Sequence, residues 1–210
     1  GGEDGSMQGA LGMLGVPCTG SGVLGSALAM DKLRSKQLWQ GIGIATGGFD
    51  VLEAATDWAA VLDRLGKVFV KPACEGSSIG MSAAADATTL RQAYELAATY
   101  EGAVIAEQFI DGPEYTVAIL RGQALPAIRL ETDNEFYDYE AKYISDDTRY
   151  LCPCGLSADE EAEMADLALR AWPPHRAEDS HVHDRAGYRP GASGAGRVRE
   201  CRRAPVAGGT

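Results

Sequence analysis

The stretch that most constrains this chain runs from Val68 to Met81, with the sequence Val-Phe-Val-Lys-Pro-Ala-Cys-Glu-Gly-Ser-Ser-Ile-Gly-Met. It begins with β-branched and aromatic residues, which predict a short buried strand. Pro72 should end this strand, because proline cannot donate a hydrogen bond to a sheet. The following loop is rich in glycine and serine, and its backbone N–H groups can surround an anion. With Lys71 at the strand end, the stretch predicts a phosphate site, although these residues alone also fit an ordinary β-hairpin.

The chain before this stretch is predicted to be mainly helical. Apolar spacing and small polar residues at the starts indicate helices over residues 6–14, 21–40 and 57–66, the last ending at a glycine. Lys32, Arg34 and Lys36 follow the apolar stripe of the second helix and give this helix a basic end. By pattern alone, they are typical of a solvated helix face.

The chain after this stretch is predicted to alternate strands and helices. Residues 81–83 can return as a strand beside the first one, and a helix capped within residues 86–89 follows. Short apolar runs separated by Asp-Gly-Pro and Arg-Gly-Gln predict an antiparallel meander over 103–130. Ser157 should cap a last helix that reaches Trp172.

Charge and composition exclude several classes of protein. The net charge of −11 disfavours nucleic acid as a partner. No apolar run approaches the roughly 20 residues needed to cross a bilayer, and the start of the chain does not resemble a signal peptide. The five cysteines are irregularly spaced, which fits free thiols in a reducing compartment such as the cytoplasm. Because the chain does not begin with methionine, we expect the true N-terminus to be missing.

The last part of the chain differs in composition. Residues 173–210 contain seven arginines, four prolines and all three histidines, but no leucine, isoleucine, methionine, phenylalanine or lysine. Such a segment cannot bury enough apolar surface to order itself, so we expect a disordered tail. One hypothesis for this change is a shifted reading frame in a GC-rich gene, which sequencing of the encoding DNA would test.

Six ordered stretches together resemble the D-alanine–D-alanine ligases of the ATP-grasp superfamily. They are Gly-Gly-Glu-Asp-Gly-Ser-Met-Gln-Gly at 1–9, Thr-Gly-Ser-Gly-Val-Leu at 19–24, Met-Asp-Lys-Leu-Arg-Ser-Lys at 30–36, Lys-Pro-Ala-Cys-Glu-Gly-Ser-Ser-Ile-Gly-Met at 71–81, Gly-Pro-Glu-Tyr-Thr-Val-Ala-Ile-Leu at 112–120 and Tyr-Asp-Tyr-Glu-Ala-Lys-Tyr at 137–143.

The resemblance implies an α+β chain with an ATP-grasp fold, built from antiparallel sheets and helices. It implies that residues 1–30 are the last part of an N-terminal substrate domain of α/β type, and that residues 31–172 belong to the ATP-grasp domain. Residues 173–210 lie outside the resemblance and are expected to be a non-native tail. The family pattern therefore predicts a truncated chain.

The resemblance also implies a reaction, the ATP-dependent joining of two D-alanines through an acyl phosphate for peptidoglycan precursor synthesis. Ser77, Lys142 and Tyr143 are the implied catalytic residues, and Ser77 and Tyr143 would hold the first D-alanine. Residues implied in ATP binding are Lys32 and Lys71 at the phosphates, Glu75 to Ser78 in a flap over them, Glu107, Gln108 and Ile110 at the adenine, Glu114 at the ribose and Lys142 at the γ-phosphate. Tyr143, rather than phenylalanine, fits the branch that makes D-Ala-D-Ala.

Mg²⁺ or Mn²⁺ is implied as the metal. The family's metal-binding segment, Glu-x-Asn-x-x-Pro-Gly-x-Thr, does not occur after Trp172. We therefore assign no metal ligand in this chain.

The resemblance also implies a cytoplasmic enzyme and a possible homodimer. The alternatives are a non-catalytic or misfolded fragment of such a ligase, or another ATP-grasp carboxylate–amine ligase.

Overall fold

The computed structural model describes residues 2–131, 149–172, 181–186 and 200–201, and shows two antiparallel sheets with helices packed against them. One sheet has four strands and the other has six. The fold class is α+β, as the sequence predicted. The predicted division into residues 1–30, 31–172 and 173–210 stays a prediction.

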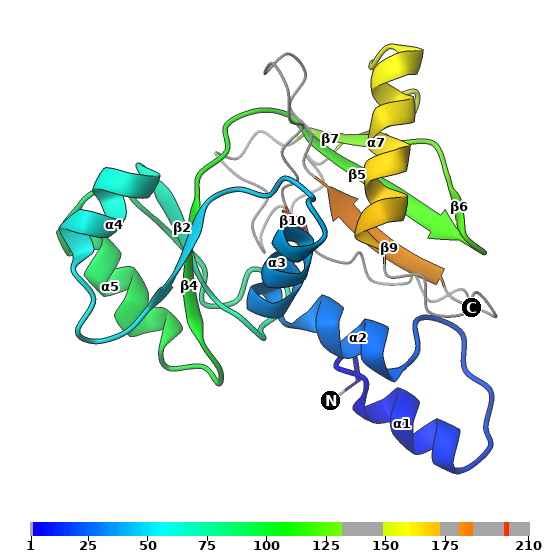
Figure 1. The fold of residues 1–210 in the computed structure, drawn as a ribbon, viewed down its shortest axis with the longest axis horizontal. Coiled ribbons are helices and arrows are strands. Elements are labelled where there is room, and N and C mark those ends of the chain that lie inside the picture. The colour runs from blue at the N-terminus through cyan, green and yellow to red at the C-terminus, as the bar shows by residue number, and fades with distance from the viewer. Residues whose placement is uncertain (1, 132–148, 173–180, 187–199, 202–210) are drawn as a thin grey trace.

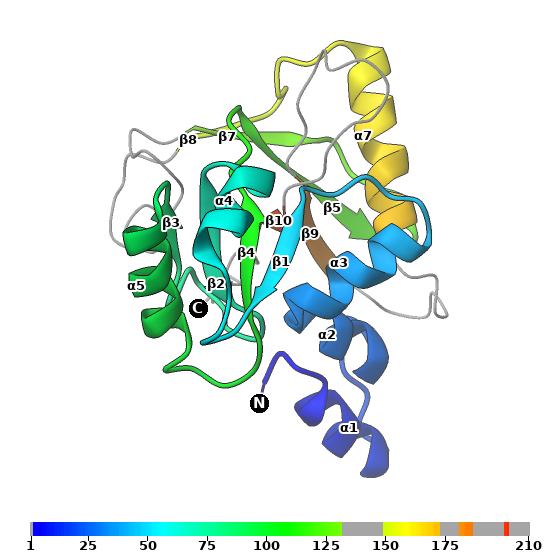
Figure 2. The same ribbon diagram turned by 60° about the vertical axis from the view of Figure 1, so that its left-hand side comes forward.

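Three helices open the chain: α1 (Ser6–Met13), α2 (Val23–Met30) and α3 (Lys32–Gly41). The single helix predicted over residues 21–40 is wrong, because the chain is extended at Asp31, with φ −93° and ψ 101°. The Asp31 side chain accepts a hydrogen bond from the Arg34 backbone N–H and so caps a new helix. This break lets α3 take a direction different from that of α2 (Figure 2).

The four-stranded sheet contains β1 (Phe49–Leu52), β2 (Val68–Pro72), β3 (Ser82–Ala84) and β4 (Val104–Gln108). The strand order is β1-β4-β2-β3, and all neighbours are antiparallel. The hairpin predicted from β2 to its returning strand is confirmed by the pairing of β2 with β3. The central strands, β2 and β4, are therefore hydrogen-bonded along both edges.

Two helices, α4 (Trp58–Leu65) and α5 (Ala87–Ala97), cover one face of this sheet (Figure 1). The predicted caps at residues 86–89 and at Gly66 are confirmed: Asp86 accepts hydrogen bonds from the first turn of α5, and Gly66 ends α4. Asp57, which was not predicted as a cap, accepts hydrogen bonds from the first turn of α4. Apolar residues of the sheet and both helices form one buried core. Helix α3 and the site described below lie on the opposite face of the sheet.

The six-stranded sheet has the order β10-β9-β5-β7-β8, with β6 pairing with β5. Its strands are β5 (Glu114–Leu120), β6 (Gln123–Ala124), β7 (Ile128–Glu131), β8 (Arg149–Leu151), β9 (His181–Ala186) and β10 (Glu200–Cys201). Strands β9 and β10 lie within 173–210, where the composition predicted disorder. Because β9 joins the edge of β5 through backbone hydrogen bonds, this pairing does not require an apolar sequence.

The meander predicted over 103–130 is only partly correct. Strands β5, β6 and β7 form an antiparallel unit, but β4 belongs to the other sheet. Both edges of β4 are occupied by β1 and β2, so residues 111–113 connect two sheets rather than two neighbouring strands.

Helix α7 (Ala158–Ala171) packs against the six-stranded sheet. Its capping box at Ser157 and Glu160 confirms the predicted start. Helix α3 lies between the two sheets (Figures 1 and 2). Trp39 of α3 packs with Leu167 and Ala171 of α7, and Leu33 of α3 packs with Ile105 of β4.

Among the helices of the described residues, none is long and apolar enough to cross a membrane.

Candidate functional site

The alternation of side chains along two neighbouring strands places a lysine and a glutamate on one face of the four-stranded sheet. Val70 of β2 and Ala106 of β4 are paired and point into the core under α4 and α5. The next residues along each strand, Lys71 and Glu107, therefore point to the opposite face. That face is covered by α3, so both side chains are buried, with exposures of 7% and 6%.

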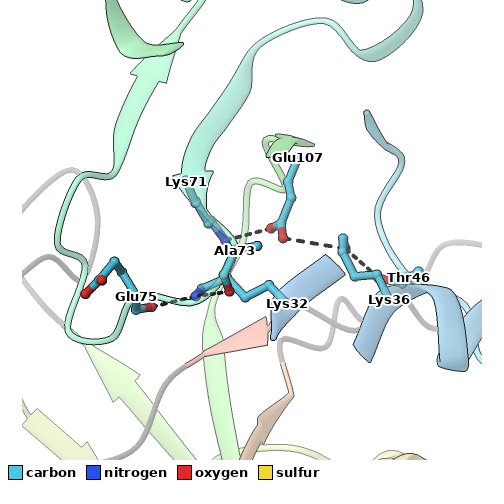
Figure 3. A network of polar contacts seen from close by, with 7 residues as sticks. All are labelled: Lys32, Lys36, Thr46, Lys71, Ala73, Glu75 and Glu107. Carbon is cyan, nitrogen blue, oxygen red and sulfur yellow. Dashed lines mark hydrogen bonds and ion pairs between the residues drawn. The ribbon is translucent and has the colours of Figure 1, made fainter. Parts of the chain in front are cut away.

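A buried ionic cluster forms where α3 crosses this face (Figure 3). Lys71 Nζ donates to Glu107 Oε2 at 2.6 Å. Lys36 Nζ lies 3.9 Å from Glu107 Oε1 and donates to Thr46 Oγ1 at 2.6 Å. A third lysine, Lys32, is one helical turn before Lys36 and is 3% exposed. We call Lys32, Lys36, Lys71 and Glu107 the lysine cluster; the formal charge of these four side chains is +2.

The cluster is connected to the glycine- and serine-rich loop by Lys32. Its Nζ donates to the carbonyl oxygens of Ala73 at 3.0 Å and Glu75 at 2.6 Å. Its backbone N–H also donates to the Ala73 carbonyl, at 3.0 Å. The start of the loop is thus fixed to the first turn of α3.

The charges around Glu107 keep its carboxylate ionised. Burial alone would raise the pKa of Glu107, but the positive charges of Lys71 and Lys36, together with the hydrogen bond from Lys71, lower it to about 2. At neutral pH Glu107 is therefore an acceptor of hydrogen bonds and not a donor. Its Oε2 atom is used by Lys71, whereas Oε1 is buried and accepts no hydrogen bond from the described residues.

The loop between β2 and β3 has a conformation suited to close approach of a ligand. Ser77 and Ser78 both have left-handed backbone conformations, with φ of 55° and 59°. Gly80 also has a positive φ of 66°, and a Cβ there would lie 2.6 Å from the Tyr100 ring. Residues other than glycine adopt this conformation at a cost of order 1–3 kcal/mol, a strain that is common at ligand-binding loops.

The segment after Glu107 packs against the chain that precedes β1. The Gln108 N–H donates to the Gly48 carbonyl at 2.8 Å. A Cβ on Gly47 would lie 3.1 Å from the Ile110 side chain. Glycine at position 47 therefore permits the close approach of residues 108–110, which continue from the lysine cluster.

The structure brings three of the predicted site residues, Lys32, Lys71 and Glu107, into one cluster. The other predicted positions that the structure describes lie on elements attached to it: Glu75, Ser77 and Ser78 on the loop, Gln108 at the end of β4, Ile110 two residues later, and Glu114 at the start of β5 in the other sheet. Lys142 and Tyr143 lie outside the described residues.

Lys36 was missed as a site residue. Together with Lys32 it was expected, by pattern alone, on a solvated helix face, but it is 2% exposed. Of the three cations in this stretch, the structure exposes only Arg34, whose side chain is 63% accessible. The signal in the sequence was the spacing of four residues between Lys32 and Lys36, which places them on one side of a helix.

Within the described residues, no group of three or more His, Cys, Asp or Glu side chains could hold a metal ion. The site supplies positive charge, an ionised acceptor and a partly exposed loop, a combination that suits a polyphosphate with an attached base.

Solved structures with the same fold are ATP-grasp ligases. The VanG D-Ala:D-Ser ligase from Enterococcus faecalis matches with a TM-score of 0.78 and 28% identity, over 96% of this chain and 60% of that one. A D-alanine–D-alanine ligase from Bacillus anthracis, solved in complex with ATP, matches with a TM-score of 0.74 and 28% identity, over 96% of this chain and 64% of that one.

The family model described as the D-ala D-ala ligase C-terminus matches residues 38–180, and the chain belongs to this family. Curated relatives include the D-alanine–D-alanine ligases of Saccharophagus degradans, 56% identical over 173 residues, and Methylococcus capsulatus, 58% identical over 172 residues. These alignments cover 82% and 81% of this chain, and 55% and 56% of the relatives. The chain thus spans about half the length of these curated relatives.

Proposed function

We propose that this chain carries the nucleotide-binding part of a ligase that joins two D-alanines using ATP. The observation that carries the proposal is the lysine cluster beside the glycine- and serine-rich loop. Buried ammonium groups are costly unless they meet negative charge, and a polyphosphate meets this need beside a loop whose backbone can approach it. The names of the curated relatives supply the substrate, D-alanine.

In the proposed reaction, the γ-phosphoryl group of ATP moves to the carboxylate of the first D-alanine. The amine of the second D-alanine then displaces phosphate and forms the peptide bond. Lys32 and Lys71 would bind the phosphates and offset the charge that spreads over their oxygens. Glu75 to Ser78 would cover the phosphates, while Glu107, Gln108 and Ile110 would contact the adenine and Glu114 the ribose.

Further roles rest on the family resemblance. Ser77 and Tyr143 would hold the first D-alanine, and Lys142 would reach the γ-phosphate. A divalent metal would neutralise phosphate charge when bound. We assign no ligand for it, because the family's metal-binding segment does not occur after Trp172. Action in the cytoplasm and assembly as a homodimer remain expectations, the second of which light scattering would test.

The nucleotide site is tested by titrating ATP into the purified chain in a calorimeter. We expect saturable binding, weakened about tenfold or more by Lys71→Ala, because a charge-assisted hydrogen bond to phosphate is lost. The control is Arg91→Ala, which removes an exposed arginine on α5 and should bind ATP as the wild type does. Circular dichroism at the same temperature verifies that both variants are folded. Equal affinities in all three proteins would contradict the assignment of Lys71.

The reaction itself is tested by phosphate release from ATP and by chromatography of the product. The proposal expects release that depends on D-alanine and yields D-alanyl-D-alanine. D-Serine is the matched alternative acceptor, because one structural neighbour is a D-Ala:D-Ser ligase. ATP binding without ligation of either amino acid would leave the nucleotide site in place and contradict the activity.

A further inference from the structure

Lys36 is a buried cation that the proposed reaction does not use. Its side chain lies on α3, with its Nζ 5.3 Å from the centre of the Phe49 ring. Removing an ammonium group from water costs several kcal/mol unless nearby groups compensate. The compensation here comes from the Thr46 hydroxyl, the Phe49 ring and the Glu107 carboxylate.

The distances separate the two polar contacts of Lys36. The contact with Thr46, at 2.6 Å, is a hydrogen bond. The 3.9 Å between Nζ and Glu107 Oε1 is too long for a hydrogen bond but short enough for a strong attraction between charges. Thr46 therefore holds the ammonium group beside Oε1 without allowing it to fill that oxygen's acceptor positions.

Thr46 belongs to the same packed unit as the residues proposed to contact the adenine. It directly precedes Gly47 and Gly48, which lie against Ile110 and Gln108. Lys36 and its hydroxyl partner thus lie beside the residues proposed to contact the adenine, and not on the glycine- and serine-rich loop. This location points to an effect on the base and not on the phosphates.

We propose that Lys36 is a positioning residue for the nucleotide base: held by Thr46, it fixes the Glu107 carboxylate and leaves the buried Oε1 without a hydrogen-bond donor from the described residues, a donor that an amino group of the base would supply. This inference rests on the proposed nucleotide site. A 6-amino purine can donate to Oε1, whereas a 6-oxo purine presents an acceptor that the carboxylate repels. The arrangement therefore favours ATP over inosine triphosphate.

The test measures the affinities of ATP and inosine triphosphate for the full chain and three variants. Lys36→Met removes the charge. Thr46→Val keeps the charge but releases the ammonium group, which can then move onto Oε1. Arg34→Met is the control, since it removes a cation from the same helix at an exposed position. In the first two variants we expect the preference for ATP to fall about tenfold, the value of one hydrogen bond to a charged group, while the affinity for inosine triphosphate stays near that of the wild type.

The outcomes separate this inference from the proposed function. A wild-type chain that binds neither nucleotide refutes the nucleotide site, and the inference with it. A wild type that binds both equally, or variants that keep the full preference for ATP, refute the inference alone. Equal weakening of both nucleotides in Thr46→Val would assign Lys36 a merely structural role and also overturn it. If Lys36→Met does not fold, the near-isosteric Thr46→Val decides the question.

Discussion

The ion pair between Lys71 and Glu107 should make a large and measurable contribution to the stability of the fold. The two groups are 2.6 Å apart and more than nine-tenths buried. Removing one partner of such a pair typically costs about 3–5 kcal/mol, because the other charge stays buried without compensation. Lys36 remains 3.9 Å from Glu107 and retains part of that compensation. We therefore expect Lys71→Met to lower the free energy of unfolding by about 3 kcal/mol, the lower end of this range.

The assay is urea unfolding at neutral pH of the wild type, Lys71→Met, Glu107→Gln and the double variant. If the two side chains interact as the structure shows, the double variant should be about 2 kcal/mol more stable than additivity of the single effects implies. The control is the exposed pair of Arg91 and Glu95 on α5, where both side chains are 60% accessible. There we expect Arg91→Met to change stability by no more than about 0.5 kcal/mol. Additive effects of Lys71→Met and Glu107→Gln would refute the reasoning.

Three further changes test individual features of the fold. Asp86→Ala removes the capping box of α5 and should cost about 1 kcal/mol in urea unfolding. Gly80→Ala places a Cβ 2.6 Å from the Tyr100 ring at a φ of +66°, and thermal unfolding should show that the free energy of unfolding falls by about 2 kcal/mol. Gly76→Ala is the control and should have little effect, because its Cβ would lie 3.9 Å from the nearest atom, on Met30. The pKa of Glu107 falls from 4.5 to about 2 on folding, so its contribution of about 3 kcal/mol is present above pH 4.5 and is lost as the pH falls towards 2. Urea titrations at several pH values should show this slope in the wild type and a smaller one in Glu107→Gln.

Local features of the sequence predicted local structure correctly. Asp86 and Ser157 cap helices because a short acceptor side chain satisfies backbone N–H groups within the same turn. The strand ending at Pro72 and its returning partner were also predicted, since a β-branched and aromatic run is followed directly by a glycine-containing loop. Each of these depends on residues only a few positions apart.

The errors arose where distant parts of the chain compete for the same partner. Strand β4 was expected to pair with β5, which follows it directly, but it lies between β1 and β2. Nothing in the apolar pattern of β4 distinguishes these partners, because a strand buried on both faces fits either sheet. The break at Asp31 was missed for a related reason. Apolar spacing continues through this position, while the aspartate can cap a new helix once α3 packs on the sheet.

The position of Lys36 shows how far a charge pattern can be interpreted without a structure. Lys32, Arg34 and Lys36 form an alternating basic run, and only the helical phase separates the first and last from the middle one. Which side of α3 becomes buried is decided by Ile105 and Glu107, which lie on a strand far along the chain.

The net charge of −11 argues against a nucleic-acid partner, yet three of the few lysines are buried around one carboxylate. An anion site depends on the local field, which falls off steeply with distance, so the acidic balance of the whole chain does not argue against the proposed polyphosphate site at these lysines.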